Sequence, residues 1–239
     1  MHSNPSGKLY LIPNTLGDTD PLQVLPGQIT TVIKRIHHYV VEHEKVARRF
    51  IKKVVPEKIQ NDLVLYPLNK HTPMEELPAY LQACRDGLDM GLISDAGAPG
   101  VADPGAAIVQ LAHEQHIQVV PLVGPSSILL ALMASGMNGQ SFSFHGYLPI
   151  DQKARRQEIK RLEHLSKEQD QSQLFIETPY RNNKLLDELL NSLHSHTRLC
   201  IATDLTLASE YVKTRPVADW KKNKVDLHKR PTLFILHQD

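Results

Sequence analysis

Residues 90–105 read Met90-Gly91-Leu92-Ile93-Ser94-Asp95-Ala96-Gly97-Ala98-Pro99-Gly100-Val101-Ala102-Asp103-Pro104-Gly105. The stretch opens as a short apolar strand and continues as a loop rich in glycine and proline. It ends on Asp103-Pro104, which predicts an acidic N-cap followed by proline at the first position of a helix. A strand, a tight loop and a helix start are typical of ligand sites in α/β domains. We predict a functional loop here; the alternative is a plain turn.

A second loop of this kind follows the apolar residues 118–123. It reads Gly124-Pro125-Ser126-Ser127 and leads into an apolar helix expected over 128–135. Hydroxyl groups and free backbone amides at a helix start suit the carboxylate or ribose of a ligand. The alternative for Ser126 is that it only caps the helix.

Strands and helices alternate along the first half of the chain. Apolar runs predict strands over 8–13, 38–41, 63–66, 90–93 and 118–123, and helical spacing predicts helices over 29–36, 44–54, 75–86 and 106–115. This alternation is typical of an α/β domain with a mostly parallel sheet. The second half again shows strands that end in polar loops, so we expect two α/β domains, residues 1–122 and 123–239.

The composition is that of an ordinary globular protein. Of 239 residues, 41% are hydrophobic and 22% charged, and the net charge is +1, so any surface that attracts nucleic acid must be local. Two basic helices are candidates for such a surface, or for mere solvated faces. Their residues are Arg48 and Lys52 in one, and Lys153, Arg155, Arg156, Lys160 and Arg161 in the other.

Cysteine and histidine usage predicts neither a disulfide nor a metal site. Cys84 and Cys200 lie far apart, and the 13 histidines include no HExxH pattern. The first residues lack a secretory core and no apolar run approaches the roughly 20 residues that span a bilayer. We therefore expect a cytoplasmic protein with reduced thiols.

Several motifs together resemble one known family. They are Ser94-Asp95-Ala96-Gly97-Ala98-Pro99, Val120-Pro121-Leu122-Val123-Gly124-Pro125-Ser126, Ala134-Ser135-Gly136, Phe144-His145-Gly146-Tyr147-Leu148-Pro149, Phe175-Ile176-Glu177-Thr178-Pro179-Tyr180-Arg181 and Ala202-Thr203-Asp204-Leu205-Thr206. In order and spacing they resemble the small-subunit rRNA (cytidine-2′-O)-methyltransferase I group of the tetrapyrrole methylase superfamily. The resemblance runs from Lys8 to about Leu236.

This resemblance implies two α/β domains with S-adenosylmethionine in a cleft between them, in a homodimer active in rRNA processing. It implies that one set of residues holds the methionine and ribose end of the cofactor and a second set surrounds its adenine. The first set is Asp95, Val101, Asp103, Ser126 and Ser127. The second set is Tyr180, Leu205, Thr206, Pro231 and Thr232.

The chain departs from the family pattern in two loops on the acceptor side. It has Asn14-Thr15-Leu16-Gly17-Asp18 where the family usually has Thr-Pro-Ile-Gly-Asn, and Glu42-His43-Glu44-Lys45 where the family usually has Glu-Asp-Thr-Arg. These departures concern the methyl acceptor and leave the cofactor motifs intact.

The expected reaction is methyl transfer to a ribose 2′-oxygen of small-subunit rRNA. A carboxylate could remove the hydroxyl proton, and the candidates are Glu177 and Asp95, with Glu42 behind them. Alternatively, Asp95 bonds loop amides and Glu177 caps a turn. Two other functions stay open: methylation of a tetrapyrrole-like small molecule, and S-adenosylmethionine binding without catalysis.

Overall fold

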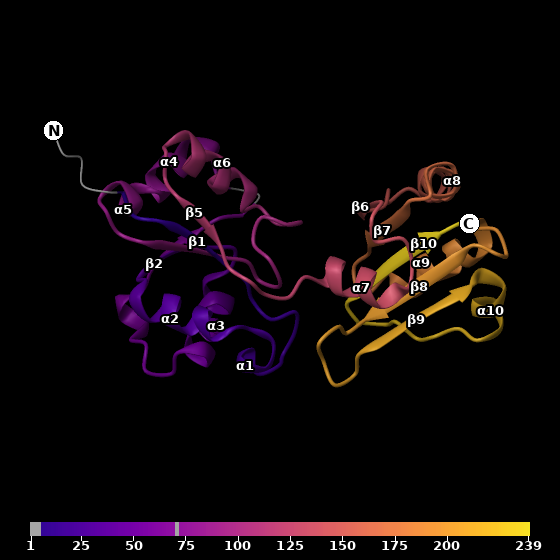
Figure 1. Ribbon diagram of the computed structural model, residues 1–239, viewed down its shortest axis with the longest axis horizontal. Coiled ribbons are helices and arrows are strands. Elements are labelled where there is room, and N and C mark those ends of the chain that lie inside the picture. The colour runs from indigo at the N-terminus through magenta and orange to yellow at the C-terminus, as the bar shows by residue number, and fades with distance from the viewer. Residues whose placement is uncertain (1–5, 70–71) are drawn as a thin grey trace. The chain divides into compact units, whose positions relative to one another are not determined.

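The computed structural model describes residues 6–69 and 72–239. Along the sequence the chain divides into two compact units, the first ending at Ser126 and the second beginning at Ser127 (Figure 1). The boundary between folding domains expected after Leu122 stays a prediction. Within the described residues, every helix is too short or too polar to span a bilayer.

The first unit is built on a five-stranded sheet in the order β3-β2-β4-β1-β5. All of its strand pairs are parallel, which confirms the predicted parallel sheet. The strands are β1 Leu9–Ile12, β2 His38–Val41, β3 Val64–Pro67, β4 Met90–Ile93 and β5 Val119–Pro121.

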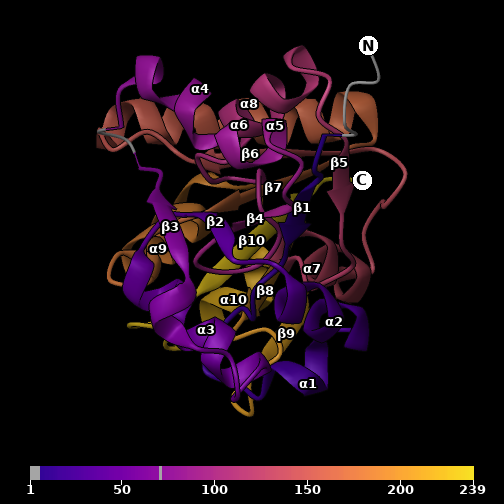
Figure 2. The ribbon, with the colours of Figure 1, turned by 90° about the vertical axis from the view of Figure 1, so that its left-hand side faces the viewer.

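Helices cover both faces of this sheet (Figure 2). The face below the sheet in that view carries α1 Pro21–Val24, α2 Gly27–Arg35 and α3 Glu44–Val54. The opposite face carries α4 Leu77–Tyr80, α5 Gln82–Arg85 and α6 Ala106–Glu114. Two 3-10 turns lie at Gln60–Asp62 and Met74–Glu76.

The single helix predicted over 75–86 is wrong. That segment is a 3-10 turn followed by two four-residue helices, α4 and α5. The chain leaves helical geometry at Leu81, which has φ −93° and ψ 9°. Pro78 stands in the first turn of α4, a position proline tolerates because the amide there needs no helical partner.

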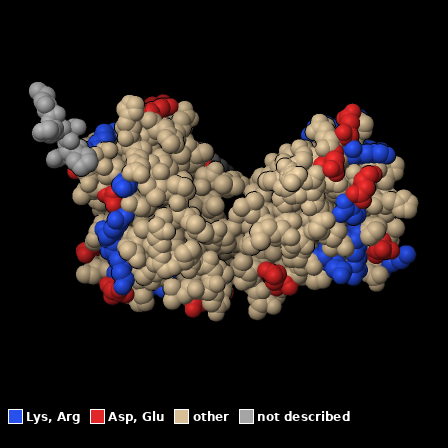
Figure 3. Space-filling view, in the orientation of Figure 1, with Lys and Arg blue, Asp and Glu red and all other residues tan. Residues whose placement is uncertain are grey.

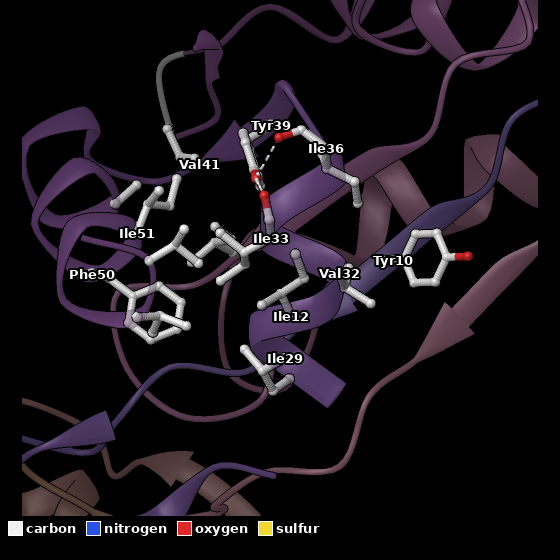
Figure 4. Close-up of a cluster of buried hydrophobic side chains, with 14 of the residues drawn as sticks. Tyr10, Ile12, Ile29, Val32, Ile33, Ile36, Tyr39, Val41, Phe50 and Ile51 are labelled. Carbon is white, nitrogen blue, oxygen red and sulfur yellow. Dashed lines mark hydrogen bonds between the residues drawn. The ribbon is translucent and has the colours of Figure 1, made fainter. Parts of the chain in front are cut away.

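Tyr39 of β2 is buried in the hydrophobic core between the first sheet and the helices α2 and α3 (Figure 4). Its hydroxyl lies 2.8 Å from the carbonyl oxygen of Ile36 and 3.2 Å from that of Ile33, which ties β2 to the end of α2. Gly91 of β4 leaves room for the ring. A Cβ at position 91 would lie 2.6 Å from Cδ1 of Tyr39 and 2.8 Å from Cδ1 of Ile12, so only glycine fits without displacing a neighbour.

The second unit is built on a mixed sheet of five strands in the order β6-β7-β10-β8-β9. Only β6 and β7 pair in parallel; the other neighbours are antiparallel. The strands are β6 Phe142–Tyr147, β7 Ser172–Ile176, β8 Arg198–Thr203, β9 Tyr211–Pro216 and β10 Thr232–His237. Because β10 separates β7 from β8, these two run in the same direction and end at the edge where β10 begins.

Four helices pack on this mixed sheet. They are α7 Ser127–Ser135, α8 Gln152–Gln169, α9 Asn182–Ser192 and α10 Val217–Lys222. Leucine side chains of α8 and α9 pack together over Phe175 and Phe234 of the sheet. The indole of Trp220 on α10 donates to the carbonyl oxygen of Leu199 at 2.8 Å, which joins that helix to β8.

Candidate functional site

The carboxyl edge of the first sheet has the topology of a ligand site. Strands β1 and β4 are neighbours, but α2 after β1 and α6 after β4 lie on opposite faces of the sheet. Open α/β sheets bind ligands in the crevice at such a switch point. The two loops are joined there, because the amide of Asn14 donates to the carbonyl oxygens of Ser94 at 3.2 Å and Asp95 at 3.0 Å.

The loop after β4 is fixed by one of its own carboxylates. Oδ1 of Asp103 accepts hydrogen bonds from the backbone N–H of Gly100 at 2.7 Å and of Gly105 at 2.8 Å. The predicted N-cap role of Asp103 is therefore wrong: Gly105 precedes α6 and no side chain caps that helix. Burial raises the pKa of the Asp103 carboxyl, while its two backbone hydrogen bonds act in the opposite direction.

His43 contacts Asp95 across two neighbouring strands. β2 and β4 pair in parallel with Val41 beside Ile93, and two residues further on this register brings His43 beside Asp95. Nδ1 of His43 lies 2.6 Å from Oδ2 of Asp95. Burial raises the pKa of the adjacent Glu42 carboxyl, and the negative charge of Asp95 adds to that rise. Sequence reasoning did not select His43, although the departure at this position was visible.

Glu42, His43 and Asp95 are also the described residues whose donor atoms lie close enough together to be compared with a metal site. Glu42, His43 and Asp95 each bring one donor atom within 4.8 Å of the others. Two ligands of one zinc ion each lie about 2.0–2.2 Å from the metal, which holds them about 3 Å or more apart. The 2.6 Å between His43 and Asp95 is instead a hydrogen-bond distance. We therefore describe the His43–Asp95 contact as a hydrogen bond.

Three further residues are predicted to hold the methionine and ribose end of the cofactor: Val101, Ser126 and Ser127. Val101 is half exposed in the loop after β4. Ser126 is partly buried beyond β5, and Ser127 is the first residue of α7. Both serines are half-buried, so their role in holding a cofactor stays a prediction.

The predicted adenine residues gather at one edge of the second sheet. Tyr180 follows β7 and is 71% exposed, and Leu205 and Thr206 follow β8. Pro231 precedes β10, and Thr232 is its first residue. The carbonyl oxygen of Pro231 accepts from the backbone N–H of Asp204 at 2.9 Å, so the loop after β8 is joined to the start of β10.

Thr206 is both strained and unsatisfied. Its φ is +69°, in the left-handed region that a β-branched residue rarely adopts. Its Oγ1 is buried without a hydrogen-bond partner among the described residues. Local strain and an orphaned polar atom are typical of ligand-binding loops, where the ligand supplies the missing partner.

Glu177 is engaged by its own turn. Its Oε1 accepts from the backbone N–H of Thr178 at 2.6 Å and from the Arg181 guanidinium at 2.7 and 3.0 Å, and its side chain is 5% exposed. These contacts are what the turn-capping alternative requires, and they engage one of the two carboxylate oxygens.

The predicted nucleic-acid residues divide into engaged and free groups. Arg155 is wrong as a phosphate contact, because its guanidinium is buried against Glu188. Arg48 donates to the carbonyl oxygen of Gln60, Lys52 to that of Pro56, and Arg161 pairs with Glu158. The remaining three residues, Lys153, Arg156 and Lys160, are exposed. They form no ion pair with any residue that the structure describes. The face shown in Figure 3 carries charges of both signs rather than one extended basic field.

The sequence profile of the Tetrapyrrole (Corrin/Porphyrin) Methylases matches residues 31–220. The chain belongs to this family. This confirms the expected superfamily, two-sheet α/β fold and methyltransferase class.

Several curated relatives of this tetrapyrrole methylase are named "Ribosomal RNA small subunit methyltransferase I". The protein of Vibrio cholerae serotype O1 is 32% identical over 175 residues, which cover 72% of this chain and 59% of the relative. The protein of Escherichia coli O157:H7 is 25% identical over 236 residues, which cover 98% of this chain and 78% of the relative. The chain thus spans about three fifths of the Vibrio cholerae protein.

Solved structures of the same fold are more distant in sequence. The methyltransferase CobJ has a TM-score of 0.63 at 19% identity, with 98% of this chain and 95% of that chain covered. A Thermus thermophilus uroporphyrin-III C-methyl transferase, complexed with S-adenyl homocysteine, has a TM-score of 0.54 at 15% identity, with 97% and 98% covered. At these identities the likeness concerns the fold.

Proposed function

We propose that this tetrapyrrole methylase transfers a methyl group from S-adenosylmethionine to a ribose 2′-oxygen of small-subunit rRNA. The observation that carries the proposal is the name shared by several curated relatives, one of which aligns with 98% of this chain. The proposal includes a cytoplasmic homodimer active in rRNA processing, as the resemblance implies.

The orphaned hydroxyl of Thr206 supports S-adenosylmethionine as the methyl donor. A buried Oγ1 without a partner fits a polar group of a bound ligand, and the strained loop around it fits a binding role. When bound, S-adenosylmethionine supplies a methyl group on a positively charged sulfur. We propose that Tyr180, Leu205, Thr206, Pro231 and Thr232 contact its adenine end. For the methionine and ribose end we propose Asp95, Val101, Asp103, Ser126 and Ser127.

A basic stripe on α8 supports RNA as the acceptor. Lys153, Arg156 and Lys160 are spaced by three and four residues, so they share one helical face, and they are exposed. Further along that helix, Lys160 and Lys167 line a surface hollow with His164 and His194. Unpaired basic side chains in such a row suit successive phosphates of an RNA strand. Arg48, Lys52 and Arg161 are proposed as weaker contributors, because each already has a partner.

Methylation of a tetrapyrrole-like small molecule is the second candidate. It is favoured by the solved relatives of this fold whose names refer to uroporphyrin or cobalt-precorrin methylation. A chain that binds S-adenosylmethionine without catalysis is the third candidate.

One experiment separates the three candidates. The full chain is incubated with methyl-labelled S-adenosylmethionine and either unmodified small ribosomal subunits or a free tetrapyrrole, and cofactor binding is measured in parallel by calorimetry. Label recovered as a 2′-O-methyl nucleoside supports the proposal. Label in the macrocycle supports the second candidate, and cofactor binding without transfer to either acceptor supports the third.

A further inference from the structure

We propose that His43, held by Asp95, is the general base that removes the proton from the acceptor hydroxyl. This inference rests on the proposed methyl transfer to a hydroxyl group and assigns it a residue. The local sequence does not indicate this role, because His43 and Asp95 lie 52 positions apart and become neighbours only through the pairing of β2 with β4.

The sheet fixes the position of both side chains. β2 and β4 are hydrogen-bonded neighbours over their full length, from His38 beside Met90 to Val41 beside Ile93. His43 and Asp95 each stand two residues beyond these last partners, at the carboxyl edge where the switch point lies. His43 also precedes α3, so its backbone is held between a strand and a helix. Groups on such rigid elements are positioned more accurately than groups on long loops.

The hydrogen bond selects one form of the imidazole. A carboxylate only accepts, so Nδ1 of His43 carries the proton it shares with Oδ2 of Asp95, and Nε2 keeps its lone pair. Nε2 has no hydrogen-bond partner among the described residues, and the His43 side chain is 64% exposed. The imidazole therefore presents a basic nitrogen outward while its other nitrogen is anchored.

The surrounding charges favour the protonated product of this step. Two carboxyl groups lie close to the His43 ring: that of Asp95, two residues after β4, and that of Glu42, the residue after β2. Negative charge at this distance stabilises an imidazolium that forms during the reaction.

The step balances without any further reactant. The acceptor oxygen forms a bond to the methyl carbon as the carbon–sulfur bond breaks, and the electron pair of that bond stays on sulfur. The acceptor proton passes to Nε2 of His43, and Asp95 holds the resulting imidazolium through Nδ1. In the proton transfer Asp95 acts as a positioning residue, in addition to its proposed contact with S-adenosylmethionine. Glu177 is less suited to the same task, because its side chain is only 5% exposed and is paired with Arg181.

The test compares His43→Gln with Asp95→Asn and with His113→Gln, a control that removes an exposed histidine on α6 of the same unit. For His43→Gln we expect the single-turnover rate on small ribosomal subunits to fall about 100-fold, a typical contribution of general base catalysis. The dissociation constant for S-adenosylmethionine should stay within about twofold of wild type, because a base acts on the acceptor. His113→Gln should keep the wild-type rate.

A second measurement reads the imidazole itself. With ¹⁵N-labelled histidine, NMR of the wild-type chain above neutral pH should show the His43 proton on Nδ1, with the resonance identified by its loss in His43→Gln. In Asp95→Asn the proton should shift toward Nε2 and the rate should fall, whereas a merely structural Asp95 would leave the proton on Nδ1.

Three results would overturn the inference: a His43→Gln rate within threefold of wild type, a wild-type proton on Nε2, or activity lost to a chelator and restored by a divalent cation. If the wild-type chain methylates no hydroxyl at all, the proposed function fails instead. The NMR result then still decides whether Asp95 selects the form of His43.

Discussion

Arg155 and Glu188 form a buried ion pair between α8 and α9. Nε of Arg155 lies 2.6 Å from Oε2 of Glu188 and Nη2 lies 2.7 Å from Oε1, so the contact is bidentate. Nη1 donates to the carbonyl oxygens of Pro149 and Ile150 at 3.1 and 2.9 Å. Arg155, although it stands within a run of basic residues, therefore stabilises the core of the second unit. Only its exposed neighbours on α8 remain as candidates for RNA contacts.

Removing one partner of this pair should destabilise the chain strongly. Glu188→Gln leaves the Arg155 charge buried without its counter-charge, and we expect a loss of about 3 kcal/mol in the free energy of unfolding. The control is Glu158→Gln, which breaks the exposed pair with Arg161 and should cost less than about 1 kcal/mol. Urea unfolding of both variants measures the difference; equal losses would contradict the buried pair.

The pair should also make the wild-type chain sensitive to acid. The hydrogen bond from Arg155 lowers the pKa of the Glu188 carboxyl below its ordinary value of 4.5. A carboxyl whose pKa is lowered by folding stabilises the native state above the unfolded pKa, and this contribution is lost as pH falls through the folded pKa. We expect the free energy of unfolding to drop below about pH 4.5. The drop should be shallower in Glu188→Gln, and identical slopes would refute the assignment.

Thr206→Val should separate cofactor binding from stability. The change keeps the shape of the side chain and removes a buried hydroxyl without a partner, so the free energy of unfolding should stay the same or rise. Loss of one hydrogen bond to the ligand should weaken S-adenosylmethionine binding about fivefold, from a contribution of roughly 1 kcal/mol. Calorimetry of the two proteins decides; unchanged affinity would remove Thr206 from the proposed cofactor set.

Neutralising the basic stripe of α8 should reduce the salt dependence of RNA binding. Each phosphate contact contributes a slope of about 0.7 to the logarithmic plot of affinity against salt for a single strand. Replacing Lys153, Arg156 and Lys160 by glutamine should therefore lower the slope by about 2. The control removes the same charge elsewhere on the second unit, at Lys221, Lys222 and Lys224. A slope that falls equally in both variants would show that net charge, and not the stripe, attracts RNA.

The fold could be predicted because its strands are short apolar runs that end in glycine- and proline-rich loops. Strand order could not, because β4 pairs with both β1 and β2 through backbone groups that every residue carries. The break between α4 and α5 was also hidden, since residues 75–86 have adequate helical spacing. The mixed direction of the second sheet depends on β10, which inserts between β7 and β8 from the far end of the chain.

The candidate site could be predicted in part. Asp95 stands out within its loop, whereas His43 is visible only once two strands are paired. The burial of Arg155 could have been predicted from its spacing, because it shares a helical face with Ile159 and Leu162, which are both fully buried. That spacing places its charge inside the protein, beside the apolar side chains of the same face.

Gly91 has a consequence that reaches beyond its own packing. A methyl group there would press on Tyr39 of β2 and Ile12 of β1, the strands on either side of β4. These three strands end, within a few residues, at His43, Asn14 and Asp95. Glycine at 91 thus lets the side chains of both neighbouring strands pack against β4. A larger residue there would displace Tyr39 and Ile12 and so disturb all three strands. The positions of Asn14, His43 and Asp95 at the carboxyl edge of the sheet therefore depend on the lack of a Cβ at residue 91.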